Sequence, residues 1–193
     1  TTDLFDRQVL EPFVTRTVKT LDGAISAYYR KRPEDIYAEL DSEDTAVKGR
    51  ALEALAIRMM RLLGLRFLRW NARAQNTGGA DVDAVVAGVF GALPTRWQIQ
   101  CKNTPNSSKL SLDHVAKEVG LVPLTNATHI LMVANADFTS HAVRFADEVM
   151  YNTSLTVFLL GRQEFSQIRK DDSALGRLLR ERAMAIVRKA PAE

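Results

Sequence analysis

The stretch Trp97-Gln98-Ile99-Gln100-Cys101-Lys102-Asn103 decides the fold, because it alternates apolar and polar residues in the manner of a β-strand. Successive side chains of a strand point to opposite faces of the sheet. A glutamine and a lysine therefore leave this strand on the same side. We expect one face to carry Trp97, Ile99 and Cys101, and the other to carry Gln98, Gln100 and Lys102.

A second strand-like run, Gly78-Gly79-Ala80-Asp81-Val82-Asp83-Ala84-Val85-Val86, precedes the first one. Aspartate is a poor strand former, and a buried aspartate is costly unless it is paired or bound to a metal. If the two strands pair, Asp83, Gln100 and Lys102 converge. Asp81 points to the same face as Asp83 and competes for the same role. The alternative for Asp83 is an aspartate at a strand end or edge that faces water, and the alternative for Lys102 is an ordinary surface lysine.

The segment 45–63 predicts a helix, because leucine, alanine and methionine recur there at helical spacing. Residues 41–45 supply candidate N-caps, and Gly64 is a candidate C-terminal stop. Glu53 lies at the margin of the apolar stripe, and Gly49 leaves room beside it. Glu53 is therefore the natural source of a second carboxylate for a metal ion. The alternative is a solvated glutamate that pairs with Arg50.

The remaining sequence alternates strands with helices. Strands are predicted at 65–70, 82–90, 96–103, 129–135 and 155–160, and helices at 112–121, 137–150, 163–170 and 173–188, after mostly helical material over 1–41. Three closely spaced strands favour a meander, and the later strands favour parallel addition across helices. This order predicts an α/β chain with three layers, α/β/α, around a mixed sheet.

Composition narrows the classes of function. Hydrophobic residues make up 46% of the 193, enough for a core, and no apolar run is long enough to span a membrane. A single cysteine excludes an internal disulfide and favours a reducing, cytoplasmic location. The net charge of +3 is a mild indication of a polyanionic partner. Zinc spacing, a P-loop, a dinucleotide motif and a Ser or Cys nucleophile motif are absent from the sequence.

A helix glutamate, a strand aspartate and a Gln-x-Lys pair, in this order, resemble the PD-(D/E)xK nuclease superfamily, and within it the Mrr-like restriction endonucleases. The likeness covers residues 46–170, with a shorter aspartate segment than the family's and a glutamine at its acidic position. It is carried by Lys48-Gly49-Arg50-Ala51-Leu52-Glu53, Leu63-Gly64-Leu65, Gly78-Gly79-Ala80-Asp81-Val82-Asp83, Ile99-Gln100-Cys101-Lys102, Ala136-Asp137-Phe138-Thr139-Ser140-His141-Ala142 and Phe158-Leu159-Leu160-Gly161.

The resemblance implies a restriction-endonuclease-like core and assigns a role to each candidate residue. Asp83 would bind Mg²⁺ together with Glu53 and the backbone carbonyl of Cys101, and Mn²⁺ would substitute. Asp81 is the alternative to Asp83. Lys102 would assist the attacking water, and Gln100 would occupy the acidic position of the motif.

The resemblance further implies a magnesium-dependent DNA endonuclease that hydrolyses phosphodiester bonds in restriction or defence against foreign DNA. A double-strand cut needs two sites, which favours a homodimer or a place in a larger defence protein. The alternatives are a catalytically inactive module that binds nucleic acid or a partner chain, and a structure-selective DNA repair nuclease. The expected organisation is a helical appendage over 1–44, a nuclease core over 45–172 and an amphipathic helix over 173–193 that packs on the core or a partner.

Overall fold

The computed structural model describes residues 31–73, 81–90, 93–104 and 108–189 of the chain. A five-stranded sheet lies at its centre, with the strands in the order β1-β2-β3-β4-β5. β1, β2 and β3 are antiparallel neighbours, and β4 and β5 add in parallel. The predicted mixed sheet, a meander with parallel additions, is therefore confirmed. The strands are β1 (Arg66–Arg73), β2 (Asp81–Phe90), β3 (Leu93–Lys102), β4 (His129–Ala134) and β5 (Thr156–Leu160).

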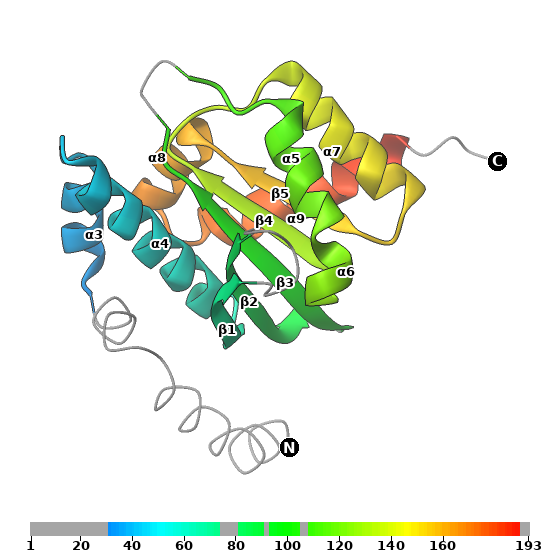
Figure 1. Cartoon of the computed structure of the whole chain (residues 1–193), viewed down its shortest axis with the longest axis horizontal. Helices are drawn as coiled ribbons and strands as arrows, with labels where there is room; N and C mark the ends of the chain where they lie inside the picture. The colour runs from blue at the N-terminus through cyan, green and yellow to red at the C-terminus, as the bar shows by residue number, and fades with distance from the viewer. Residues whose placement is uncertain (1–30, 74–80, 91–92, 105–107, 190–193) are drawn as a thin grey trace, which may run out of the picture.

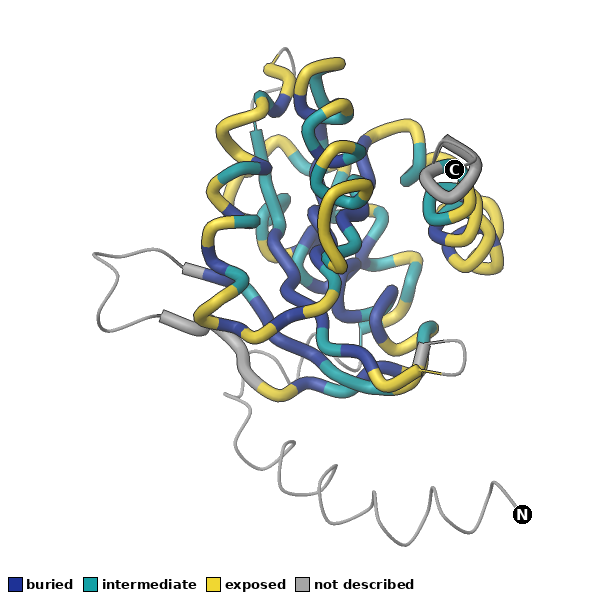
Figure 2. Tube along the Cα trace, turned by 90° about the vertical axis from the view of Figure 1, so that its right-hand side faces the viewer, coloured by how far each residue is buried: buried dark blue, intermediate teal, exposed yellow. Residues whose placement is uncertain are grey.

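Helices cover both faces of the sheet, which confirms the three predicted layers (Figure 1). One face packs against α3 (Pro33–Leu40), α4 (Thr45–Leu62), α8 (Arg162–Lys170) and α9 (Ala174–Lys189). The other packs against α5 (Leu112–Gly120), α6 (Val122–Thr125) and α7 (Ser140–Asn152). Figure 2 shows the buried segments in the interior, surrounded by helices that alternate buried and exposed residues.

The side chains of β3 alternate between the two faces as predicted. Trp97 and Ile99 lie in the larger core cluster with α4, and Cys101 packs against it. Gln98 points the other way and donates a hydrogen bond to Glu118 of α5. Gln98 and Gln100 are both buried, however. The strand is thus covered on its polar face as well, which the alternation alone did not indicate.

Local sequence explains both ends of α4. The Asp44 side chain caps its first turn, because Oδ1 accepts hydrogen bonds from the backbone nitrogens of Ala46 (2.7 Å) and Val47 (3.2 Å). Gly64 follows the helix with φ of 69°, a left-handed conformation that favours glycine. The Leu65 nitrogen then donates to the Met60 carbonyl at 2.9 Å. The predicted stop at Gly64 is confirmed.

One helix prediction needs correction, and one short helix was not predicted. The helix predicted from 137 begins only at Ser140, because Phe138 forms a parallel bridge with Leu110. Thr139 then caps the helix by accepting a hydrogen bond from the Ala142 nitrogen at 3.2 Å. The short helix α6 was not predicted, because four residues containing a proline carry no helical period.

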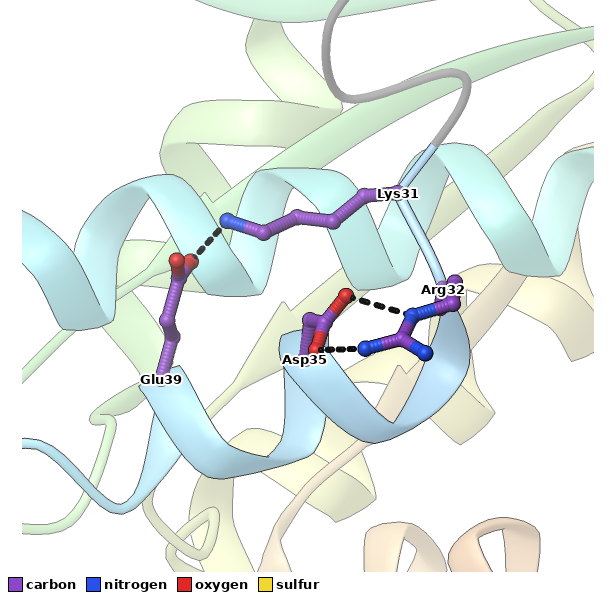
Figure 3. Close-up of polar contacts among 4 residues, drawn as sticks. All are labelled: Lys31, Arg32, Asp35 and Glu39. Atoms are coloured by element: carbon purple, nitrogen blue, oxygen red, sulfur yellow. Dashed lines mark hydrogen bonds and ion pairs between the residues drawn. The ribbon is translucent and has the colours of Figure 1, made fainter.

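Ion pairs hold the start of α3 (Figure 3). Lys31 pairs with Glu39, and Arg32 donates two hydrogen bonds of 3.0 Å to the Asp35 carboxylate. Ile36 of the same helix lies in the larger core cluster, and α3 packs against α4. Most of the helical segment predicted over 1–41 lies outside the described residues. Each described helix is too short or too polar to cross a bilayer.

Candidate active site

The strands β2 and β3 separate at Asp83. Their pairing runs from Phe90 and Leu93 to Ala84 and Ile99, and Asp83 is the next residue. Its Oδ2 accepts a hydrogen bond from the backbone nitrogen of Cys101 at 2.5 Å. The carboxylate therefore satisfies a backbone donor where the ladder stops, and it lies between the two strands instead of projecting from one face.

The Gln100 amide contacts two oxygens at this point. Its Nε2 donates to Asp83 Oδ2 at 2.9 Å and, more weakly, to the Cys101 carbonyl at 3.4 Å. Its Oε1 is buried and has no hydrogen-bond partner, an arrangement that costs about 1–3 kcal/mol in a folded protein. The two proposed oxygen ligands thus converge on one nitrogen, as they would on a cation. The orphaned Oε1 is a further oxygen beside them.

Glu53 of α4 places a second carboxylate within electrostatic range of Asp83. It is half-buried, and burial, followed by the negative charge of Asp83, raises its pKa to about 7. Arg50 opposes this shift, yet no ion pair between Glu53 and Arg50 is present in the described part of the chain. Burial also raises the pKa of Asp83, against the hydrogen bond from Cys101 and the charge of Lys102. Two carboxylates that resist ionisation together are a fitting pair of ligands for a divalent cation.

Lys102 lies at the end of β3 and is half-buried. In the part of the chain that the structure describes, its ammonium has no hydrogen bond and no ion pair. Its positive charge nevertheless lowers the pKa values of Asp83 and of Glu118. The ammonium is therefore within electrostatic range of both carboxylates and is available to an incoming anion.

The Cys101 side chain points away from the polar face, and its Sγ lies 3.9 Å from the Leu52 carbonyl of α4. Burial raises the pKa of this thiol well above its usual value, so it stays protonated and is no nucleophile. The thiol still lies close enough to the Asp83 carboxylate to lower the pKa of Asp83 through a side-chain hydrogen bond, a weaker effect than that of the Cys101 backbone nitrogen.

The competing aspartate, Asp81, pairs through its backbone with Arg73 at the end of β2, and its side chain lies outside the described residues. Among the described residues, no group of three or more His, Cys, Asp and Glu side chains could hold a metal. Glu53 and Asp83 fit Mg²⁺ only if backbone, amide and water oxygens complete the shell. Mg²⁺ commonly binds in this way, through one or two carboxylates and several waters.

Sequence reasoning missed the polar residues that surround these side chains. Glu118 is fully buried on α5 and accepts a hydrogen bond from Gln98 Nε2 at 3.0 Å. Its spacing of three from Val115 placed it on the apolar face of the helix, a signal that was available. Asn103 and Asn135 lie beyond the ends of β3 and β4, and their side chains bond to each other at 2.6 Å. The sequence gives no periodic signal for that contact.

A family model described as restriction endonuclease matches residues 45–168, more than half of the chain. Among solved structures, the chain is similar to the DNA modification-dependent restriction endonuclease AspBHI, with 12% identity and a TM-score of 0.48, over 89% of this chain and 41% of that one.

It is also similar to the MspJI restriction endonuclease in complex with a 27-mer oligonucleotide, with 20% identity and a TM-score of 0.46, over 83% of this chain and 35% of that one. The alignments thus span less than half the length of either of these chains. No curated protein matches the sequence. The family match, which contains Glu53, Asp83 and Lys102, shows that this chain belongs to the restriction endonuclease family.

Proposed function

We propose that the chain is the nuclease domain of a Mg²⁺-dependent DNA endonuclease that acts in restriction. The observation that carries the proposal is the convergence of Asp83 Oδ2 and the Cys101 carbonyl on one amide nitrogen. The charges of a second carboxylate, Glu53, and of the Lys102 ammonium, which has no partner among the described residues, both act on Asp83. This is the charge distribution that phosphodiester hydrolysis needs: oxygen ligands for a cation beside a cationic group for the phosphate.

Each residue then has one role. Asp83, Glu53 and the Cys101 carbonyl would hold the cation, and rotation of the Gln100 amide would turn its buried Oε1 toward a bound water. When bound, Mg²⁺ or Mn²⁺ polarises the phosphate and lowers the pKa of a coordinated water. The ammonium of Lys102 would stabilise the negative charge that develops on the phosphoryl oxygens.

Cleavage of supercoiled plasmid in Mg²⁺ tests the proposal, with methylated and unmethylated DNA because nothing in the site selects a base. Lys102→Ala removes a contact to the developing phosphoryl charge, and Asp83→Asn weakens a cation ligand. We expect each to lower the cleavage rate about 10²- to 10³-fold. Lys117→Ala, which removes an exposed lysine of α5, serves as the control for charge and should cut normally. Wild-type rates in the two active-site variants would refute the assignment.

The same assay reports on the number of chains that act together. One chain offers one such site, so a double-strand cut requires two copies of the domain. We propose a homodimer on DNA, and we expect the fraction of linear product to rise with protein concentration. Nicked circles alone at every concentration would argue for a domain that acts singly.

A binding module without catalysis is the second candidate, and Gln100 favours it. A glutamine at the acidic position adds no negative charge, so within the described residues only the carboxylates of Glu53 and Asp83 are left to neutralise a bound Mg²⁺. Titration calorimetry with Mg²⁺, in the presence and absence of duplex DNA, separates the two functions. DNA binding without Mg²⁺ uptake and without cleavage would favour the binding module.

A further inference from the structure

The side chain of Asn103 joins three elements at the open end of the sheet. Its Nδ2 donates to the Thr45 carbonyl in the first turn of α4 at 2.9 Å. Its Oδ1 accepts from Asn135 Nδ2, beyond β4, at 2.6 Å. Asn103 directly follows Lys102, the last residue of β3, so this bridge is attached to the end of the strand that carries Gln100 and Lys102.

Asn135 fixes the other half of the bridge. Its Oδ1 accepts from the Thr104 backbone nitrogen at 2.8 Å, and its Nδ2 donates to the Thr104 carbonyl at 3.0 Å. Its own backbone nitrogen donates to the Lys102 carbonyl at 3.3 Å. The backbone from 102 to 104 is therefore held on both sides of Asn103, and the Asn103 side chain has a fixed base from which to reach α4.

The bridge meets α4 on the stripe that carries Glu53. Residues four apart lie on one helix face, so Thr45, Gly49 and Glu53 follow one another along this stripe. A Cβ at Gly49 would lie 3.8 Å from Asn103 Nδ2, which confirms that the amide lies against it. Within β3 itself, Cys101 Sγ makes a long approach of 3.9 Å to the Leu52 carbonyl of α4.

We infer that Asn103 is a positioning residue: its hydrogen bond to Thr45 sets the place of the α4 carboxylate, Glu53, relative to the β2 and β3 oxygens. This inference rests on the proposed metal site. Mg²⁺ and Mn²⁺ demand ligands at closely defined distances, and outer residues that hold ligands in place affect metal affinity strongly. Core packing would still hold α4 against the sheet without this bond, but its first turn would lose the polar tie that, in this inference, fixes the distance from Glu53 to Asp83.

Mn²⁺ binding to the full chain without DNA, followed by electron paramagnetic resonance, tests the inference without a measurement of cleavage. We expect Asn103→Ala to weaken Mn²⁺ binding about tenfold. In a Glu53→Gln background the same substitution should have no further effect, because no α4 carboxylate remains to be positioned. This double-mutant cycle isolates the coupling between the two residues.

A purely structural role for Asn103 would give a different pattern. Gly49→Ala raises helix propensity at a site with ordinary van der Waals space. In the double variant with Asn103→Ala, it should restore the melting temperature but leave Mn²⁺ binding weak. Restored Mn²⁺ affinity, an equal loss in the Glu53→Gln background, or unchanged affinity in Asn103→Ala would each overturn the inference alone. Absence of Mn²⁺ binding by the wild-type chain would overturn the proposed metal site and the inference together.

Discussion

The Gln100 amide determines the electrostatic balance of the candidate site. Its Nε2 donates hydrogen bonds to Asp83 Oδ2 and to the Cys101 carbonyl. A carboxylate at this position would instead add a third negative group to those of Asp83 and Glu53. The glutamine thereby stabilises the metal-free site at the expense of ligand charge. In the proposed metal site, glutamine at this position would thus favour the folded state without metal and lower the affinity for the cation.

Gln100→Glu should reverse this balance. Without metal, the new carboxylate faces Asp83 and leaves the Cys101 carbonyl without a donor, so we expect stability in EDTA to fall by about 1–3 kcal/mol. With metal, a third carboxylate raises the ligand charge, so Mg²⁺ affinity should rise. Thermal melts across a Mg²⁺ titration measure both effects. The matched control is Gln100→Met, which has similar length and no ligand charge, and an equal response of both variants to Mg²⁺ would contradict the argument.

The residues that strand alternation could predict are those whose role depends on their own strand. Gln100 and Lys102 share a face because the period of a strand is two. The alternation did not show that the Asp83 carboxylate lies between the strands, because that depends on where β2 and β3 separate. Asn103 and Asn135 were missed for a related reason. Their contact joins residues 32 apart in sequence, and no local pattern encodes it.

At the scale of elements, the junctions around β4 hold the end of the sheet where the candidate site lies. The Gly161 nitrogen, at the start of α8, donates to Glu164 Oε2 at 2.9 Å. Arg162 donates from Nη2 to the Asn135 carbonyl at 3.2 Å. The start of α8 therefore packs against the segment that follows β4. The sequence predicted α8 and β4 but not this junction. Hydrophobic periodicity predicts which face of a helix or strand is buried, and it does not predict which segments meet at the ends of those elements.

Gly161→Ala tests how tight this junction is. A Cβ at Gly161 would lie 2.9 Å from the Ala136 carbonyl, a backbone atom that cannot move away cheaply. We expect destabilisation of about 1–3 kcal/mol, the usual cost of overpacking. At Gly176 in α9, a Cβ meets nothing within 4 Å, so Gly176→Ala should stabilise by up to about 1 kcal/mol. Urea unfolding of both variants measures the difference, and changes of the same sign would show that the junction relaxes.

At the scale of the whole molecule, an aromatic stack spans three of the five strands of the sheet. The rings of Trp97 on β3 and His129 on β4 lie 4.5 Å apart, and Trp97 lies 5.4 Å from Phe158 on β5. Trp97 and Phe158 are buried in the larger core cluster. A titratable ring thus contributes to the packing that unites the parallel half of the sheet with β3.

This stack makes the stability of the fold depend on pH. Burial lowers the pKa of His129 to about 4, from 6.5 in the unfolded chain. Below pH 6.5 the unfolded chain therefore binds a proton that the folded chain does not, and the contribution of His129 to stability, complete above pH 6.5, is lost as the pH falls toward 4. Glu53, with its pKa raised to about 7, changes stability with the opposite sign, because its contribution is lost as the pH rises. The effect of His129 is therefore measured as the difference in stability between wild type and a His129 variant, in which the effect of Glu53 cancels.

His129→Phe keeps an aromatic ring in the stack and removes the titration. It also removes the 2.9 Å hydrogen bond between Thr128 Oγ1 and Nδ1 of His129. That loss is a constant offset in stability at pH 7 and pH 8, and it is subtracted before the change toward pH 4 is read. Relative to wild type, the variant should gain stability by about 1–2 kcal/mol between pH 7 and pH 4, after allowance for the partial exposure of the ring. Urea unfolding at a series of pH values measures this difference. A difference that stays constant over that range would mean that His129 takes up its proton in the folded protein as readily as in the unfolded chain.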